Sequence, residues 1–159
     1  MNVRAPETLL IRKVPDPVLR QVCTPVVDFD AALATFAQAM LDAMYAAPGR
    51  GLAAPQVGVT QRLFVMDTTW KDAAPTPQVF VNPQIIWCSE TATTMDEGCL
   101  SIPGQLVPVT RPAEVDLRWQ SLDGTTQQAR QTGFAAACVQ HEVDHLDGIL
   151  CTDHAERTP

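Results

Sequence analysis

The chain has 159 residues, a length that fits one hydrophobic core, so we expect residues 1–159 to form a single domain. Hydrophobic residues make up 46% of the chain and charged residues 18%, which excludes an intrinsically disordered protein. The 18 acidic and 11 basic residues give a net charge of -7. Because such a surface repels phosphate groups, we expect no direct nucleic-acid binding.

Cysteine usage and the distribution of apolar residues both predict a cytoplasmic protein. The five cysteines are odd in number and form no Cys-x-x-Cys pair, which is typical of a reducing compartment. The N-terminal residues 1–6 contain no apolar run of the kind found in a secretory signal. No stretch approaches the ~20 consecutive apolar residues of a membrane-spanning helix, so we expect no membrane association.

The first predicted helix follows an N-terminal segment that prolines divide into extended chain and turns. Asp28 or Asp30 can cap this helix, and the pair Pro48-Gly49 ends it. Hydrophobic residues between these points recur at helical spacing, at Leu33, Phe36, Met40, Leu41 and Met44.

Short runs of β-forming residues fill the middle of the chain, and a hairpin turn is predicted at Leu122–Thr125. The expected strands are 62–67, 79–81, 85–87 and 114–119. A second helix is predicted from about Gly133 to Asp147, with Gly148 just beyond its end. The order of helix, strands and helix predicts an α+β domain in which the last helix packs against an antiparallel sheet.

The segment Gly49–Gly58 is rich in glycine and contains a single amide side chain, that of Gln56. Its first six residues match the G-x-G-x-x-A pattern of dinucleotide-binding proteins, but they follow a helix where that pattern requires a strand. We therefore interpret this segment as a backbone wall from which Gln56 directs one hydrogen-bond donor.

The second helix carries the sequence His141-Glu142-Val143-Asp144-His145. Residues four apart lie on one face of a helix, so both imidazoles can bind the same cation. Glu142 lies one residue further around the helix, where its carboxylate can take a proton from a metal-activated water. The alternative is an amphipathic helix that carries two histidines by chance, which we consider the rarer case.

A catalytic site of this kind needs a third protein ligand and an open position, and the candidates are Cys99, His154 and several carboxylates. Cys99 follows Gly98, which permits close approach of the backbone, but an isolated cysteine is more often an ordinary buried thiol. His154 belongs to a polar C-terminal segment, where a solvated histidine is expected. Glu97 and Asp144 are candidate acceptors for the imidazole N–H groups.

Three segments together resemble the signature motifs of the peptide deformylases. They are Gly49–Gln56 (GRGLAAPQ), Glu97–Ser101 (EGCLS) and Gln140–His145 (QHEVDH). Their order and spacing match the family, and the resemblance extends over nearly the whole chain. It implies antiparallel sheets packed around a C-terminal helix that carries the metal-binding His-Glu-x-x-His motif.

The resemblance also implies a reaction and the residues that perform it. The reaction is hydrolysis of the N-formyl group from the starting methionine of newly made polypeptides, which releases formate. The implied metal ligands are Cys99, His141 and His145. They bind one divalent ion per chain; iron(II) is the ion associated with the family, and zinc, nickel or cobalt can occupy such sites. Glu142 is the implied general base, and Gln56 and the backbone N–H of Leu100 are the implied donors to the oxyanion.

We expect the pocket for the methionine side chain on one face of the second helix, where Phe134, Ala137 and Cys138 recur at helical spacing. The alternative is that Phe134 and Cys138 belong to an ordinary core between helix and sheet. The resemblance places Gly51 and Arg50 beside the substrate cleft. Arg50 stands where the family usually has a small aliphatic residue, which bears on substrate preference.

Other differences from the family concern the substrate and the ribosome. Leu106 stands where some members direct an arginine toward the peptide backbone, and Ala137 replaces a larger residue. The chain ends eleven residues after Gly148, without the long basic helix that some members use to bind the ribosome. Since the net charge is also negative, we do not expect strong docking on the ribosome.

Two other functions fit parts of the sequence. A cysteine hydrolase would use Cys99 as the nucleophile and a histidine as the base, but it would give no role to the paired histidines or to Glu142. A deformylase-like protein could instead act on another N-acyl group or only bind peptides, an alternative suggested by Arg50 and Leu106.

Overall fold

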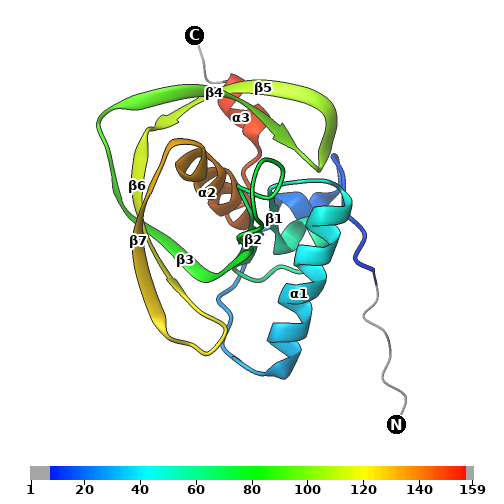
Figure 1. Cartoon of the computed structure of the whole chain (residues 1–159). Helices are drawn as coiled ribbons and strands as arrows, with labels where there is room; N and C mark the ends of the chain where they lie inside the picture. The colour runs from blue at the N-terminus through cyan, green and yellow to red at the C-terminus, as the bar shows by residue number, and fades with distance from the viewer. Residues whose placement is uncertain (1–7, 157–159) are drawn as a thin grey trace.

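The structure, a computed structural model, describes residues 8–156 (Figure 1). Two short 3-10 helices, η1 and η2, accompany the α-helices and strands. The order of elements is η1 (Pro17–Arg20), α1 (Ala31–Ala46), β1 (Gly51–Ala53), η2 (Ala54–Val57), β2 (Leu63–Met66), β3 (Gln78–Cys88), β4 (Ala92–Cys99), β5 (Ile102–Pro112), β6 (Glu114–Gln120), β7 (Thr126–Thr132), α2 (Gly133–Leu146) and α3 (Cys151–Glu156). Within residues 8–156, no helix is both long and apolar enough to cross a membrane.

Helix α1 begins after Asp30, whose carboxylate accepts a hydrogen bond from the Leu33 N–H at 3.0 Å. This side-chain acceptor satisfies an N–H group that has no partner inside the helix. The helix ends at Ala46, shortly before Pro48, which cannot continue it. The predicted helix is confirmed, and of the two candidate caps the structure uses Asp30.

A five-stranded antiparallel sheet, in the order β1-β2-β3-β6-β7, has one long helix on each face (Figure 1). Strand β2 shows why both faces of the sheet are covered, because all four of its residues are buried and successive side chains point to opposite faces. Leu63 and Val65 belong to the hydrophobic cluster that contains the α1 residues, whereas Phe64 and Met66 pack with Val139 of α2. The sheet is therefore covered by α1 on one face and by α2 on the other.

Strands β4 and β5 form a separate two-stranded hairpin that crosses over α2 (Figure 1). Its turn lies at Leu100 and Ser101, directly after Cys99. Val107 and Val109 of β5 share a hydrophobic cluster with residues that include those of α3. This packing fixes the hairpin over the last helices, so α2 lies between two antiparallel sheets, as the predicted α+β fold requires.

Helix α2 confirms the second predicted helix. Gly148 follows it with a φ of 73°, in the left-handed region that glycine adopts most readily. A Cβ atom at this position would lie 2.6 Å from the carbonyl oxygen of Arg20, so the glycine also permits a close approach between distant parts of the chain.

The strand predictions were incomplete. The sequence pattern does not predict β1, β4, β5 or β7, although the turn before β7 is placed correctly. β4 and β5 escape prediction because exposed threonines and prolines interrupt their hydrophobic residues. β3 is one strand where two runs are predicted, because Pro83 lies within a register shift of the β3–β6 pairing, next to Asn82 with a φ of 49°. The expected polar tail forms α3 up to Glu156.

Candidate metal and catalytic site

The α2 helix and the end of β4 bring three buried side chains together. His141 and His145 lie one turn apart on α2, and Cys99 is the last residue of β4. Their ligand atoms lie within 4.8 Å of one another, and no other such group occurs among residues 8–156. His154, the other candidate ligand, is directed elsewhere, because its Nε2 lies 2.8 Å from a carboxylate oxygen of Asp144.

The spacing of these three side chains and the protonation of His145 fit a divalent cation. Cys99 Sγ lies 3.4 Å from His145 Nε2, which in turn lies 3.2 Å from His141 Nε2. Tetrahedral ligands about 2.0–2.3 Å from a metal ion are themselves separated by roughly 3.3–3.7 Å, close to these distances. Burial lowers the pKa of His145 well below its ordinary value, which favours the neutral imidazole that metal binding requires.

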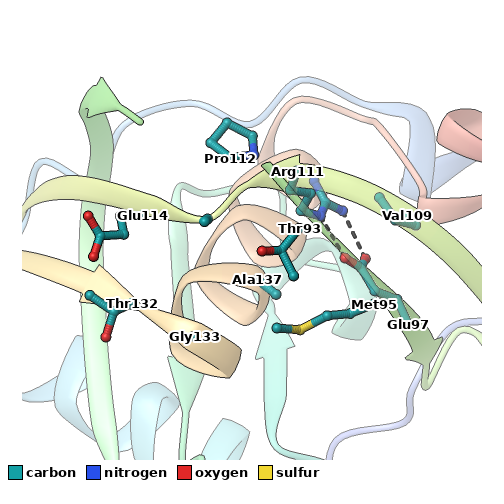
Figure 2. A pocket seen from close by; sticks show the side chains of 11 residues that line it. Thr93, Met95, Glu97, Val109, Arg111, Pro112, Glu114, Thr132, Gly133 and Ala137 are labelled. Carbon is teal, nitrogen blue, oxygen red and sulfur yellow. Dashed lines mark hydrogen bonds and ion pairs between the residues drawn. The ribbon is translucent and has the colours of Figure 1, made fainter. Parts of the chain in front are cut away.

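Glu97, which is itself bound by Arg111, orients the His141 ring. The Nδ1 atom of His141 lies 2.9 Å from Glu97 Oε1, so a proton on Nδ1 leaves the lone pair of Nε2 directed at the site. Arg111 donates two hydrogen bonds to the Glu97 carboxylate, at 2.6 and 2.9 Å (Figure 2). Burial alone would raise the pKa of Glu97, but the hydrogen bonds from Arg111 and His141 lower it to about 2.

Asp144 does not contact either imidazole of the metal group. It accepts one hydrogen bond from Arg111, at 2.9 Å, and faces His154 on α3. Of the two predicted acceptors for the imidazoles, Glu97 lies in the expected place and Asp144 instead supports Arg111. Arg111 itself was missed by the sequence reasoning, although a charged residue in the alternating apolar pattern of Val107 and Val109 could have indicated a buried ion pair.

Glu142 lies beside these three candidate ligands with one carboxylate oxygen unused. Its side chain is 3% exposed, Oε1 lies 3.8 Å from His141 Nε2, and the buried Oε2 has no hydrogen-bond partner. Burial is the main cause that raises the pKa of Glu142 to about 7. Gly51 permits this position, since a Cβ atom there would come within 3.1 Å of the carboxylate. The arrangement can accept or release a proton near neutral pH.

The Gln56 side chain is held in one orientation by two contacts. Its Oε1 accepts a hydrogen bond from the Ala53 N–H at 2.9 Å, and its Nε2 donates to Ser101 Oγ at 3.0 Å. The same Nε2 lies 3.7 Å from Cys99 Sγ. The amide N–H group therefore faces Cys99, one of the three candidate ligands. Ser101 was not among the predicted site residues.

A cleft of about 870 Å³ leads to this group. Among the predicted site residues, all except His145 line it: Arg50, Gly51, Gln56, Cys99, Leu100, Phe134, Ala137, Cys138, His141 and Glu142. His145 lies at the inner side of the group with 1% exposure. Phe134 is partly exposed in the cleft rather than buried between helix and sheet, whereas Cys138 also packs against the α2 face of the sheet.

Comparisons with known proteins agree with this geometry. The family model for polypeptide deformylase matches residues 8–159. A peptide deformylase of Mesorhizobium japonicum is 46% identical over 144 residues, which cover 91% of this chain and 82% of the relative. One from Brucella suis is 47% identical over the same length and shares of the two chains.

The chain belongs to the polypeptide deformylase family. It is an enzyme of this type, and the predicted family is confirmed. Solved structures agree with the fold as well. The peptide deformylase of Thermotoga maritima matches with a TM-score of 0.90 at 38% identity and covers 96% of this chain and 99% of its own. The one of Synechococcus elongatus, solved in complex with actinonin, matches with a TM-score of 0.90 at 38% identity and covers 98% and 84%.

Arg50 and Leu106, two residues expected to differ from the family pattern, both line the cleft. The Arg50 guanidinium stacks over the Phe134 ring, 5.2 Å from its centroid, and lies 3.5 Å from an Asp72 carboxylate oxygen. Arg50 therefore lies along the cleft wall rather than fully in solvent. Leu106, on β5, is 68% exposed and presents an apolar side chain to the cleft.

Proposed function

We propose that this chain hydrolyses the formyl amide of N-formylmethionyl peptides at the base of the cleft, with Glu142 as the proton-transferring residue. The observation that carries the proposal is the unpartnered Oε2 of Glu142 beside three side chains with metal-ligand spacing. Membership of the deformylase family supports the same reaction. The products are formate and a peptide with a free amino terminus.

Cys99, His141 and His145 are the residues that would hold the divalent ion. When bound, such an ion supplies a Lewis acid and lowers the pKa of water toward neutrality. One thiolate and two neutral imidazoles suit iron(II), which we propose as the natural ion, and also zinc, nickel and cobalt. Glu97, held by Arg111, keeps the His141 ring in the orientation that this role needs.

Glu142 moves the proton in both halves of the reaction. Its Oε2 accepts a proton from the attacking water and then delivers it to the nitrogen of the leaving amine. A pKa of about 7 suits both steps, because the group is then neither too weak a base nor too weak an acid at neutral pH. Because the buried Oε2 atom has no hydrogen-bond partner, this oxygen is available to substrate.

Gln56 and Leu100 are proposed to stabilise the charge that develops on the formyl oxygen. The Gln56 amide is oriented before substrate binds, because Ala53 and Ser101 hold its two ends. The backbone N–H of Leu100 lies in the hairpin turn directly after Cys99. A preorganised donor of this kind contributes about 3–4 kcal/mol to transition-state stabilisation.

The substrate is proposed to be the formylated end of a new polypeptide, with its methionine side chain along Phe134, Ala137 and Cys138 of α2. We expect neither nucleic acid nor membrane as a partner and only weak docking on the ribosome, given the net charge of -7. All five cysteines are free, which supports action in the reducing cytoplasm.

Release of formate from formyl-Met-Ala by anaerobically prepared protein tests the proposal, with metal analysis of the same sample. We expect turnover together with about one metal ion per chain. Reloading the stripped protein with iron, zinc, nickel or cobalt then compares the four ions. An active protein without metal would instead support Cys99 as a nucleophile, and a metal-loaded protein without turnover would support a binding role.

A further inference from the structure

A second cavity of about 220 Å³ lies between the β4–β5 hairpin and the start of α2 (Figure 2). Its residues are Thr93, Met95, Glu97, Val109, Arg111, Pro112, Ala113, Glu114, Thr132, Gly133 and Ala137. Three of them, Met95, Glu97 and Ala137, also line the main cleft. The second cavity is therefore the space on the far side of these three residues.

The space exists because the first turn of α2 carries small side chains beneath the hairpin. Gly133 and Ala137 face the cavity from the helix, while Thr93 and Met95 face it from β4. β4 pairs with β5 alone, and the larger sheet borders the gap through Glu114, the first residue of β6, and Thr132, the last residue of β7. On the hairpin side, packing is closer further along β5, where Val107 joins the cluster that includes Cys151 of α3.

The three shared residues, Met95, Glu97 and Ala137, separate the main cleft from the second cavity. Glu97 is fixed, since Arg111 and His141 bind its carboxylate. Ala137 contributes a single methyl group. Met95 is an unbranched and flexible side chain that changes rotamer at low cost. Because Met95 lines both spaces, a change of its rotamer alters the partition between the cleft and the second cavity.

We propose that the pocket for the first side chain of the substrate continues past Ala137 and Met95 into the second cavity, so that the enzyme accepts unbranched first side chains longer than methionine. The inference rests on the proposed deformylase function and adds a substrate class to the same site. The side chain enters along Phe134, Ala137 and Cys138, which line the cleft on one face of α2. Its end then lies near Val109 and Pro112, which offer apolar contact.

Formylated dipeptides with first residues of increasing length test this extension. Formyl-norleucyl-Ala matches methionine in length, and formyl-2-aminooctanoyl-Ala has a longer straight side chain. In a closed pocket each extra methylene costs on the order of tenfold or more in kcat/KM. For the wild-type enzyme we expect instead that kcat/KM for formyl-2-aminooctanoyl-Ala stays within about tenfold of kcat/KM for formyl-norleucyl-Ala.

Ala137→Leu narrows the passage, and the readout is the ratio of kcat/KM for the longer substrate to that for norleucine. We expect this ratio to fall by about tenfold or more. Ala135→Leu is the matched control, because Ala135 lies on the same helix but lines neither cavity. It should leave the ratio unchanged.

Thr93→Leu is a second variant, which fills the second cavity from an exposed position on β4. Because the change is on a strand, its result does not depend on whether α2 tolerates a larger residue. Its control is Thr94→Leu, on the next residue of β4, which lines neither cavity. We expect a lower ratio for Thr93→Leu only. Rejection of the longer substrate by the wild type, or an equal ratio in all four variants, would overturn the extension. Absence of turnover with formyl-Met-Ala would instead overturn the proposed function.

Discussion

Glu97 and Glu142 are two buried carboxylates that face the same histidine, yet their environments push their pKa values in opposite directions. Glu97 is 8% exposed and Glu142 3% exposed, so burial alone does not separate them. The pKa of Glu97 is lowered to about 2, whereas that of Glu142 is raised to about 7. Both carboxylates lie close to His141, with nearest oxygen–nitrogen distances of 2.9 and 3.8 Å.

The difference comes from hydrogen bonds to charged or polar partners, which Glu97 makes with Arg111 and His141 and which Glu142 lacks at Oε2. Arg111 donates two hydrogen bonds to Glu97 and none that the structure records to Glu142. A carboxylate with such partners is a permanent anion that can orient an imidazole, whereas one without them can exchange a proton. The contrast teaches that one site can give two buried glutamates different roles through the hydrogen-bond partners that it provides for each of them.

The largest expected effect comes from removal of the exchangeable carboxylate. Glu142→Gln keeps the shape of the side chain but cannot accept the proton, so kcat should fall by about 10²- to 10⁴-fold. Metal content should stay at the wild-type level, because Glu142 is not one of the three ligands. Formate release and metal analysis check both statements. Near-normal turnover would remove Glu142 from its proposed role.

Removal of the Arg111 cation should affect stability rather than proton transfer directly. Arg111→Met leaves Glu97 buried without its main partner, and loss of one member of a buried pair costs about 3–5 kcal/mol in the free energy of unfolding. Urea denaturation at neutral pH measures the change. Arg130→Met is the matched control, since its ion pair with Asp116 lies at the surface and should matter little. Equal stability of both variants would contradict the role of Arg111.

A milder change tests the orienting role of Glu97 itself. Glu97→Gln retains an acceptor for the His141 Nδ1–H but removes the charge, so metal affinity should fall by roughly 10- to 100-fold. Competition with a chelator measures this loss. Glu142→Gln, measured in the same way, should bind metal as the wild type does. Unchanged affinity in Glu97→Gln would assign the orientation of the ring to packing instead.

The contrast between the two glutamates could be predicted only in part from the sequence. The His141-Glu142-x-x-His145 spacing sets the relation of three groups on one helix, because helical geometry is local. Arg111 comes from the return strand of a hairpin whose register the sequence pattern does not reveal. The pairing that sets the pKa of Glu97 depends on this register, so it required the structure.

The fold shows the same division between local and long-range information. Helix α1 follows from the Asp30 cap, hydrophobic spacing and the proline beyond its end, and α2 follows from helical spacing and the glycine beyond its end; these signals act within a few residues. Strands β4 and β5 are stabilised by each other and by α2 and α3, so their own residues carry little signal. Pro83 misled the prediction for β3, because a bulge accommodates a proline that would otherwise end the strand.

A third buried carboxylate, Asp67, extends the comparison away from the cleft. Burial would raise its pKa, but hydrogen bonds from the Tyr45 hydroxyl and from the N–H groups of Thr69, Thr76 and Trp70 overcome this and lower it. The pKa of Tyr45 is raised to about 12, first by burial and then by the bond to Asp67. Asp67 thus resembles Glu97 in being a satisfied anion, although neutral donors replace the arginine.

Asp67→Asn should therefore lower stability while leaving catalysis unchanged. An amide cannot accept at both ends, so about one hydrogen bond is lost, worth about 1 kcal/mol in the free energy of unfolding. A depressed pKa stabilises the fold above the unfolded value of about 3.9, and this contribution disappears as the pH falls through the folded value. The stability difference between wild type and variant should be constant near pH 7 and shrink below about pH 3.9. Denaturation from pH 7 to 3 measures it, with Asp42→Asn, a substitution at an exposed position, as the control. A gap that persists at pH 3 would mean that neutral hydrogen bonding, rather than the charge of Asp67, holds this region together.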